Sequence, residues 1–181
     1  MCSGVVNGIS NCIIDFNKNH PNKTRTEWFI IKPVKIYIDQ SSKIEYTNQN
    51  TVVAFSNHHH KSVLLKSKDK KQLEKFFRVA SKPKLFIYKT FAVLICLLIE
   101  SEIKTVSQII IDTEYTGQNN LIKNLIYQTL KNHGHKINRK LISFAQVGKK
   151  AKCHQIAIDT LNHKIKPTEV ISLKKVLRYL L

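Results

Sequence analysis

Acidic residues are scarce in this sequence, which has 12 Asp and Glu against 30 Lys and Arg and a formal net charge of +18 at pH 7. A codon bias toward Lys would raise the Lys content, but it would not by itself keep Asp and Glu so few. The excess of positive charge predicts a polyanionic partner, because Lys and Arg neutralise phosphates and release their counterions. We expect nucleic acid as that partner, with an anionic membrane surface as the weaker alternative.

The chain also lacks paired cysteines and long apolar runs. Its four cysteines include no CxxC pair, which argues against a disulfide framework or a cysteine-bound zinc and favours a reducing compartment. The longest apolar stretch, residues 91–99, is far too short to span a bilayer. The first residues have no basic region of the kind that opens a secretory signal. The sequence therefore predicts a soluble cytoplasmic protein with no membrane partner.

Hydrophobic residues make up 43% of the chain, which is enough to form a core. We expect residues 1–32 to be an N-terminal extension and residues 33–165 to be the main domain. Residues 166–181 are expected to form a C-terminal helix that packs on this domain.

Changes in hydrophobic period divide the main domain into strands and helices. Strands are expected at residues 34–39, 51–56, 62–66, 106–112 and 141–147, and helices at residues 67–80, 85–99, 119–132 and 152–161. Short turns favour antiparallel pairing of the first three strands, and a right-handed crossover brings the fourth strand parallel to the first. The predicted fold is α/β, with a mixed five-stranded sheet in the order 3-2-1-4-5, strand 2 antiparallel, and helices on both faces.

The expected helix at residues 67–80 is amphipathic and basic. Leu73, Phe76, Phe77 and Ala80 fall on one face, which we expect to point toward the core, while its lysines lie mostly elsewhere. The basic side of this helix is one candidate surface for phosphate.

Two of the predicted strands end in aspartate. Residues 34–39 end in Asp39, residues 106–112 end in Asp112, and Glu114 follows two positions later. In the predicted strand order Asp39 and Asp112 emerge side by side at one edge of the sheet, where α/β proteins bind ligands. Close carboxylates repel each other unless a cation lies between them, and oxygen ligands favour Mg²⁺ or Mn²⁺. The alternative is that each aspartate caps a turn at the end of its strand.

The motifs "IYID" and "IIID" at the ends of the first and fourth strands, and "CHQIAIDTL" after the fifth, carry a resemblance to a known family. With this order of elements, residues 34–162 resemble the ribonuclease H-like superfamily. The resemblance implies two divalent metals bound by Asp39, Asp112 and Asp159, and phosphodiester hydrolysis by in-line attack of water. Many members carry a Glu early in the helix after the third strand. Residues 84–88 contain no acid there, so Glu114 is the expected replacement, with Glu45 and Glu74 as weaker alternatives.

A basic segment lies between the fifth strand and the helix that follows it. Lys149, Lys150 and Lys152 stand beside the free N–H groups of a helix start, so we expect them to contact the phosphate backbone of a substrate. His154 is a candidate for phosphate contact or proton transfer. The histidine tract at residues 58–60 is better explained as a solvated hairpin tip, because three consecutive turn residues cannot all face one ion.

These features predict a metal-dependent nuclease that hydrolyses RNA or DNA, either an RNA–DNA hybrid or a structured nucleic acid. One alternative is a catalytically inactive nucleic-acid-binding protein of the same fold. Another is an interaction protein whose basic surface meets an acidic partner. The sequence leaves the type of nucleic acid and the oligomeric state open.

Overall fold

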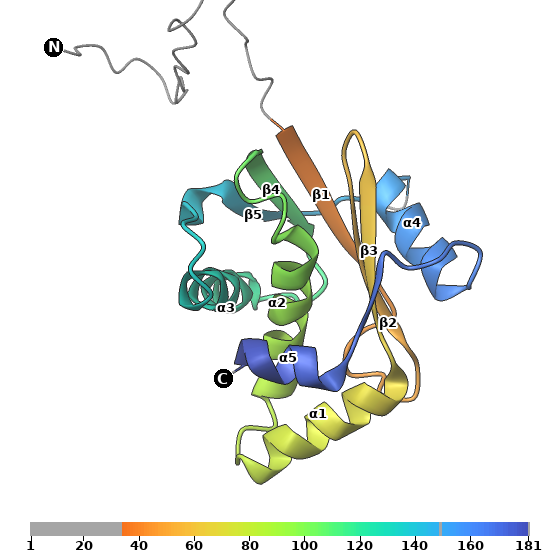
Figure 1. Cartoon of the computed structure of the whole chain (residues 1–181), viewed down its shortest axis with the longest axis vertical. Coiled ribbons are helices and arrows are strands. Elements are labelled where there is room, and N and C mark those ends of the chain that lie inside the picture. The colour runs from red at the N-terminus through yellow and green to blue at the C-terminus, as the bar shows by residue number, and fades with distance from the viewer. Residues whose placement is uncertain (1–33, 149, 181) are drawn as a thin grey trace, which may run out of the picture. The chain divides into compact units, whose positions relative to one another are not determined.

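The computed structural model describes residues 34–148 and 150–180, which form an α/β fold around a mixed six-stranded sheet (Figure 1). The sheet order is β5-β4-β1-β2-β3-β6. Its strands are β1 (Val34–Ser41), β2 (Thr51–Ser56), β3 (His60–Leu65), β4 (Val106–Asp112), β5 (Ile142–Ala145) and β6 (Glu169–Ile171). Strand β1 pairs antiparallel with β2 and parallel with β4, so the chain directions of β1 and β4 bring their carboxyl ends to the same edge.

Five helices cover the sheet: α1 (Ser67–Val79), α2 (Leu85–Ile99), α3 (Asn119–Asn132), α4 (Lys152–Leu161) and α5 (Leu173–Leu180). Helix α4 lies on one face, where it contacts β1, β2 and β3. Helices α2, α3 and α5 pack together on the opposite face, and α1 contacts α2 and α5 (Figure 1). A short 3-10 turn, Arg139–Leu141, leads into β5. The expectation of an α/β fold with a mixed sheet is therefore confirmed.

The main core lies between the sheet and α2. This helix is buried over most of its length, because its sequence is apolar around nearly the whole circumference. Ile36 and Ile38 of β1, together with Ile109 and Ile111 of β4, belong to this core. Since side chains alternate along a strand, the residues between them and directly after them point to the face that carries α4. Asp39 and Asp112 are on that second face.

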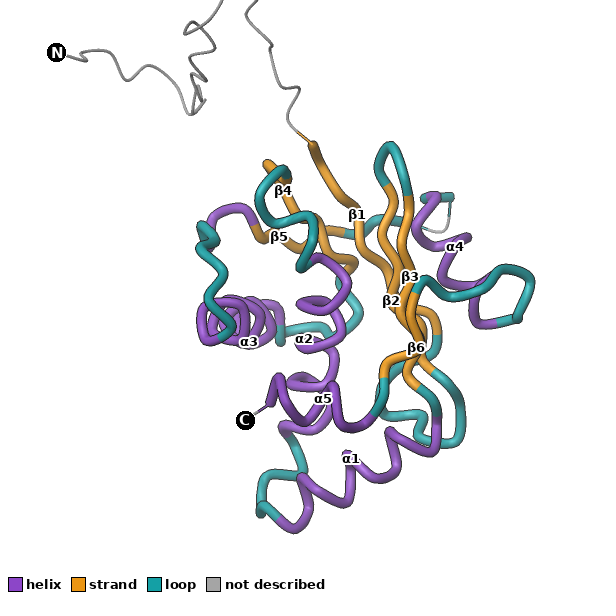
Figure 2. Tube along the Cα trace, viewed as in Figure 1, coloured by secondary structure: helices purple, strands orange, loops and turns teal. Residues whose placement is uncertain are grey.

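The predicted number of strands is wrong, because the sheet gains a sixth strand from the segment expected to be only a C-terminal helix. Strand β6 pairs parallel with Val63–Leu65 of β3 and directly precedes α5 (Figure 2). With three residues it is too short to produce a recognisable alternation, and its pairing with β3 decides its conformation. The predicted N-terminal extension, residues 1–32, lies outside the described residues.

The predicted orientation of α1 is also partly wrong. Phe76 is 39% exposed and Ala80, just after the helix, is exposed, whereas Lys70 is completely buried. Lys70, Leu73 and Phe77 point inward, so the helix is rotated relative to the expected face. The burial of Lys70 is explained by its hydrogen bonds, described below.

Across the described ranges, 34–148 and 150–180, no helix combines the length and the apolar character that a membrane crossing requires.

Candidate metal centre

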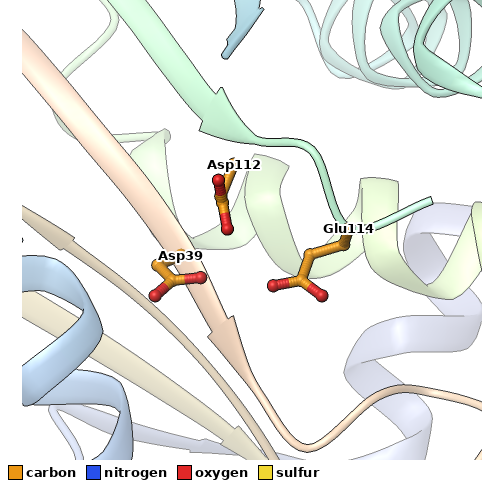
Figure 3. A group of neighbouring side chains, drawn as sticks. All are labelled: Asp39, Asp112 and Glu114. Carbon is orange, nitrogen blue, oxygen red and sulfur yellow. The ribbon is translucent and has the colours of Figure 1, made fainter. Parts of the chain in front are cut away.

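Three carboxylates meet at the carboxyl ends of β1 and β4. One oxygen from each of Asp39, Asp112 and Glu114 lies within 4.8 Å of the others, and the side chains point toward one another (Figure 3). Parallel pairing of β1 with β4 aligns Ile38 with Ile111, so the next residues, Asp39 and Asp112, are neighbours. The structure thus brings together three of the four acids that the sequence proposed.

Asp39 is the most enclosed of the three, with 3% of its surface exposed. Its Oδ1 accepts a hydrogen bond of 2.7 Å from the backbone N–H of Gln40. Its Oδ2 lies 2.5 Å from Nδ1 of His154, the third residue of α4. A carboxylate next to Nδ1 favours the proton on that nitrogen and fixes the orientation of the ring.

Asp112 ends β4 and is held by the loop that follows β5. The backbone N–H of Val147 donates a 2.7 Å hydrogen bond to its Oδ1. The same loop leads into α4, whose first residues bring His154 to Asp39. The connection from β5 to α4 therefore positions Asp112 of β4 directly and Asp39 of β1 through His154.

Glu114 lies just beyond β4, where the backbone has left the sheet. Its pKa is raised to about 7, because burial disfavours its charged form and the charges of Asp39 and Asp112 add to this effect. Folding alone provides too little positive charge for the cluster, since Lys43 opposes this shift without reversing it. A divalent cation between the carboxylates would remove the repulsion, and oxygen-only ligands suit Mg²⁺ or Mn²⁺.

The backbone at Glu114 is held by the loop between β1 and β2. Nζ of Lys43 donates a 3.3 Å hydrogen bond to the carbonyl of Glu114 and lies 5.6 Å from the ring centroid of Tyr115. The hydroxyl of buried Tyr115 accepts from the N–H of Ile44 at 3.3 Å and donates to Glu45 at 3.2 Å. These contacts connect the loop to the segment that carries Glu114.

Lys70 of α1 also holds the loop between β1 and β2. Its ammonium donates to the carbonyls of Lys43 and Tyr46, at 3.2 and 2.8 Å, and to Oγ1 of Thr51 at 2.7 Å. Three acceptors match the three N–H groups of a lysine, which explains how this side chain can be completely buried. Burial lowers the pKa of Lys70 to about 8, although the charge of Glu45 opposes the shift.

Asp159, the fourth predicted acid, is not part of the cluster. Gln155 donates a 2.9 Å hydrogen bond to its Oδ2, and Nζ of Lys164 lies 3.4 Å from its Oδ1. These contacts, with Gln155 the larger, hold the pKa of Asp159 below its usual value. Asp159 lies five positions after His154, which on an α-helix is a rotation of roughly 140° and a rise of about 7.5 Å. His154, rather than Asp159, is the α4 residue that reaches the acids.

The predicted phosphate-binding lysines lie at the start of α4. Lys150 and Lys152 are exposed on either side of Ala151, the residue that precedes the helix. Lys149 falls outside the described residues. The side chain of Ala151 cannot cap the helix, so N–H groups of the first turn remain available to an acceptor.

The sequence did not identify Tyr115, Lys43 or Lys70 as supports of the site. A usable signal existed only for Lys70, which shares the spacing of Leu73 and Phe77 along the inner stripe of α1. The contacts of Lys43 and Tyr115 join segments about 70 residues apart in the chain, and no local pattern encodes such a pairing.

Comparisons with protein-family models, with curated proteins and with solved structures found no match to this chain.

Proposed function

We propose that this protein is a Mg²⁺- or Mn²⁺-dependent nuclease of ribonuclease H-like fold that hydrolyses phosphodiester bonds in RNA or DNA. The observation that carries the proposal is the triad of Asp39, Asp112 and Glu114 at the carboxyl ends of two parallel strands. Folding gathers three carboxyl groups in a chain with a net charge of +18. Such a gathering costs stability unless a cation binds there.

The arrangement of the sheet supports the fold assignment within this proposal. Read from the other side, the first five strands stand in the order β3-β2-β1-β4-β5, with β2 antiparallel and a sixth strand added beside β3. A fold alone does not establish chemistry, but the acids and His154 supply the groups that hydrolysis needs.

The residues of the site have separate roles in this proposal. Asp39 and Asp112 would hold metal between the two strands, and Glu114 would complete the set of oxygen ligands. A divalent metal held there would supply an activated water and would stabilise the departing oxygen of the phosphodiester. Lys150 and Lys152 would hold the substrate backbone by charge and direct it to the acids.

His154 is suited to proton transfer or to orienting Asp39. Its Nδ1 is engaged by Asp39 at 2.5 Å, and its side chain is 26% exposed. That leaves Nε2 as the nitrogen that can exchange a proton with water or substrate.

Cleavage assays test the proposal directly. The protein would be incubated with RNA–DNA hybrid, duplex RNA, duplex DNA and branched DNA, in Mg²⁺, Mn²⁺ or EDTA. We expect cleavage of at least one substrate that requires metal and is lost in Asp112→Asn. Glu102→Gln is the matched control, because Glu102 is paired with Lys61 at the opposite end of β4. Asp159→Asn shows whether this acid takes part, and its position predicts activity close to that of the wild type.

A catalytically inactive nucleic-acid-binding protein is the second candidate. The observation that favours it is the absence of any acid in the first turn of α2, where many ribonuclease H-like proteins carry a Glu. Salt-sensitive binding with no cleavage in either metal would select this alternative, since phosphate contacts weaken steeply with ionic strength. Binding to an acidic protein but to no nucleic acid would reject both.

A further inference from the structure

The face of the sheet that carries α4 is only partly covered. Helix α4 contacts β1, β2 and β3, and its apolar side packs against Val52, Ala54 and Leu64. Among the described residues, no other helix packs on this face over β4 and β5 (Figure 1). The uncovered half of the face therefore begins at β1, beside the acids.

Strand pairing arranges this half-face in rows. Asp112 pairs with Ala145, and Asp39 completes their row. The next row contains Tyr37, Ile110 and Ser143. The third pairs Lys35 with Gln108. Tyr37 thus stands one row from the carboxylates, at a distance of about 6.6 Å along the strand.

Tyr37 is unusual because it is 40% exposed although β1 lies in the interior of the sheet. Interior strands of α/β sheets are normally covered on both faces. Exposed Lys35 lies two residues before it, and Ile110 beside it is only partly buried. An exposed aromatic ring next to a cation is the pair of features that binds a nucleobase and its phosphate.

We propose that this half-face binds one strand of nucleic acid, with the base next to the scissile phosphate stacked on Tyr37. The inference rests on the proposed function, because it takes the acid cluster as the point of cleavage. The spacing between neighbouring rows is comparable to the length of one extended nucleotide. A base stacked on Tyr37 therefore leaves the adjoining phosphate at the acids. Lys35 then faces the phosphate backbone further along the bound nucleic acid. Stacking accepts any base, so the site has little sequence preference.

Fluorescence of a single-stranded oligonucleotide that contains 2-aminopurine and a non-hydrolysable linkage tests the proposal in Mg²⁺, where the metal offsets the charge of the acids and cleavage cannot interfere. We expect Tyr37→Ala to weaken binding about tenfold and to remove most of the quenching. Tyr37→Phe and Tyr37→Trp should retain both. Tyr37→Val serves as a second truncation that suits a strand, and thermal unfolding shows whether each variant is folded. Tyr127→Ala on α3, which packs on the opposite face of the sheet, is the control.

Salt dependence separates stacking from charge. The slope of binding against salt should remain unchanged in Tyr37→Ala but fall by about one in Lys35→Ala. Unchanged binding in folded Tyr37→Ala and Tyr37→Val, with metal-dependent cleavage intact, would overturn this inference and leave the nuclease proposal standing. Weakened binding without cleavage in any metal would support the inference and reject hydrolysis. A wild-type protein that binds no nucleic acid overturns both.

Discussion

The two ends of β4 carry acids in opposite situations. At its start, Glu102 accepts hydrogen bonds from Lys61 and Ser101, both at 2.8 Å, and lies 3.5 Å from His59. Burial alone would raise the pKa of Glu102, but these hydrogen bonds and the charges of Lys61 and His59 outweigh it and lower the pKa. At the other end of the strand, roughly 20 Å away, burial and two neighbouring acids raise the pKa of Glu114 to about 7.

The contrast separates acids that stabilise the fold from acids that need a ligand. Lys61 and Ser101 satisfy Glu102 within the protein itself. Among the residues that the structure describes, Lys43 is the cation that lowers the pKa of Glu114, and it binds the backbone carbonyl of that residue. A chain rich in Lys could have supplied a closer cation, as it did for Glu102. The crowding of carboxylates at the end of β4 supports the proposed metal site.

The largest effect is expected from Asp112→Asn. The asparagine keeps an oxygen for the N–H of Val147 but loses the charge, so the fold should persist while metal binding fails. We expect the cleavage rate to fall on the order of 10³-fold or more, measured with the preferred substrate in Mg²⁺. Glu102→Gln should change the rate little. Equal losses in both variants would mean that the two ends do not differ in function.

Metal should stabilise the protein through the acid triad alone. Mn²⁺ at 100 times its dissociation constant should raise the free energy of unfolding by about 2.7 kcal/mol, measured by urea denaturation. Asp112→Asn should lose this gain and Glu102→Gln should keep it. A gain that survives in Asp112→Asn would place the metal elsewhere.

Lys70 is a buried cation whose hydrogen-bond partners, like those of Glu102, come from the protein itself. Lys70→Met leaves three acceptors without a donor and should cost about 1 to 3 kcal/mol at pH 7. In the wild type the folded pKa is about 8, below its usual value of 10.5, so the unfolded state binds more protons between these values. Stability should therefore rise with pH across this window relative to Lys70→Met. Urea denaturation at pH 7 and pH 10 measures the difference, and a constant gap between the two proteins would contradict it.

The smallest effects should come from removing the two glutamate charges without metal. Because the folded pKa of Glu114 is raised, its contribution to stability is lost as pH rises through about 7. Glu114→Gln should therefore stabilise the protein at pH 8 by about 1 kcal/mol. Glu102 has a lowered pKa, so its contribution persists at pH 8 and Glu102→Gln should cost about 1 kcal/mol. Urea denaturation in EDTA at pH 5 and pH 8 compares the free energies of unfolding of the two variants. Changes of the same sign in both variants would contradict the difference between the two ends of β4.

Much of the site could be anticipated because its parts are encoded locally. Asp39 follows an alternating segment and Asp112 follows a β-branched apolar run, and both patterns predict strands. The pairing of β1 with β4 could then be predicted from the right-handedness of the crossover alone. Asp159 misled because its apolar neighbours gave the same local signal, while the rotation of α4 directs His154 to the acids instead.

The sequence by itself determined the α/β class, the strands that carry Asp39 and Asp112, and the net positive charge, since periodicity and composition act over a few neighbouring residues. Only the tertiary structure decided that β6 joins the sheet, that Lys70 is buried, and that Tyr37 stays exposed beside the acids. Each of these depends on which distant segment supplies a hydrogen-bond partner or covers a face. Contacts of that kind form between residues far apart in the chain, so no local pattern records them.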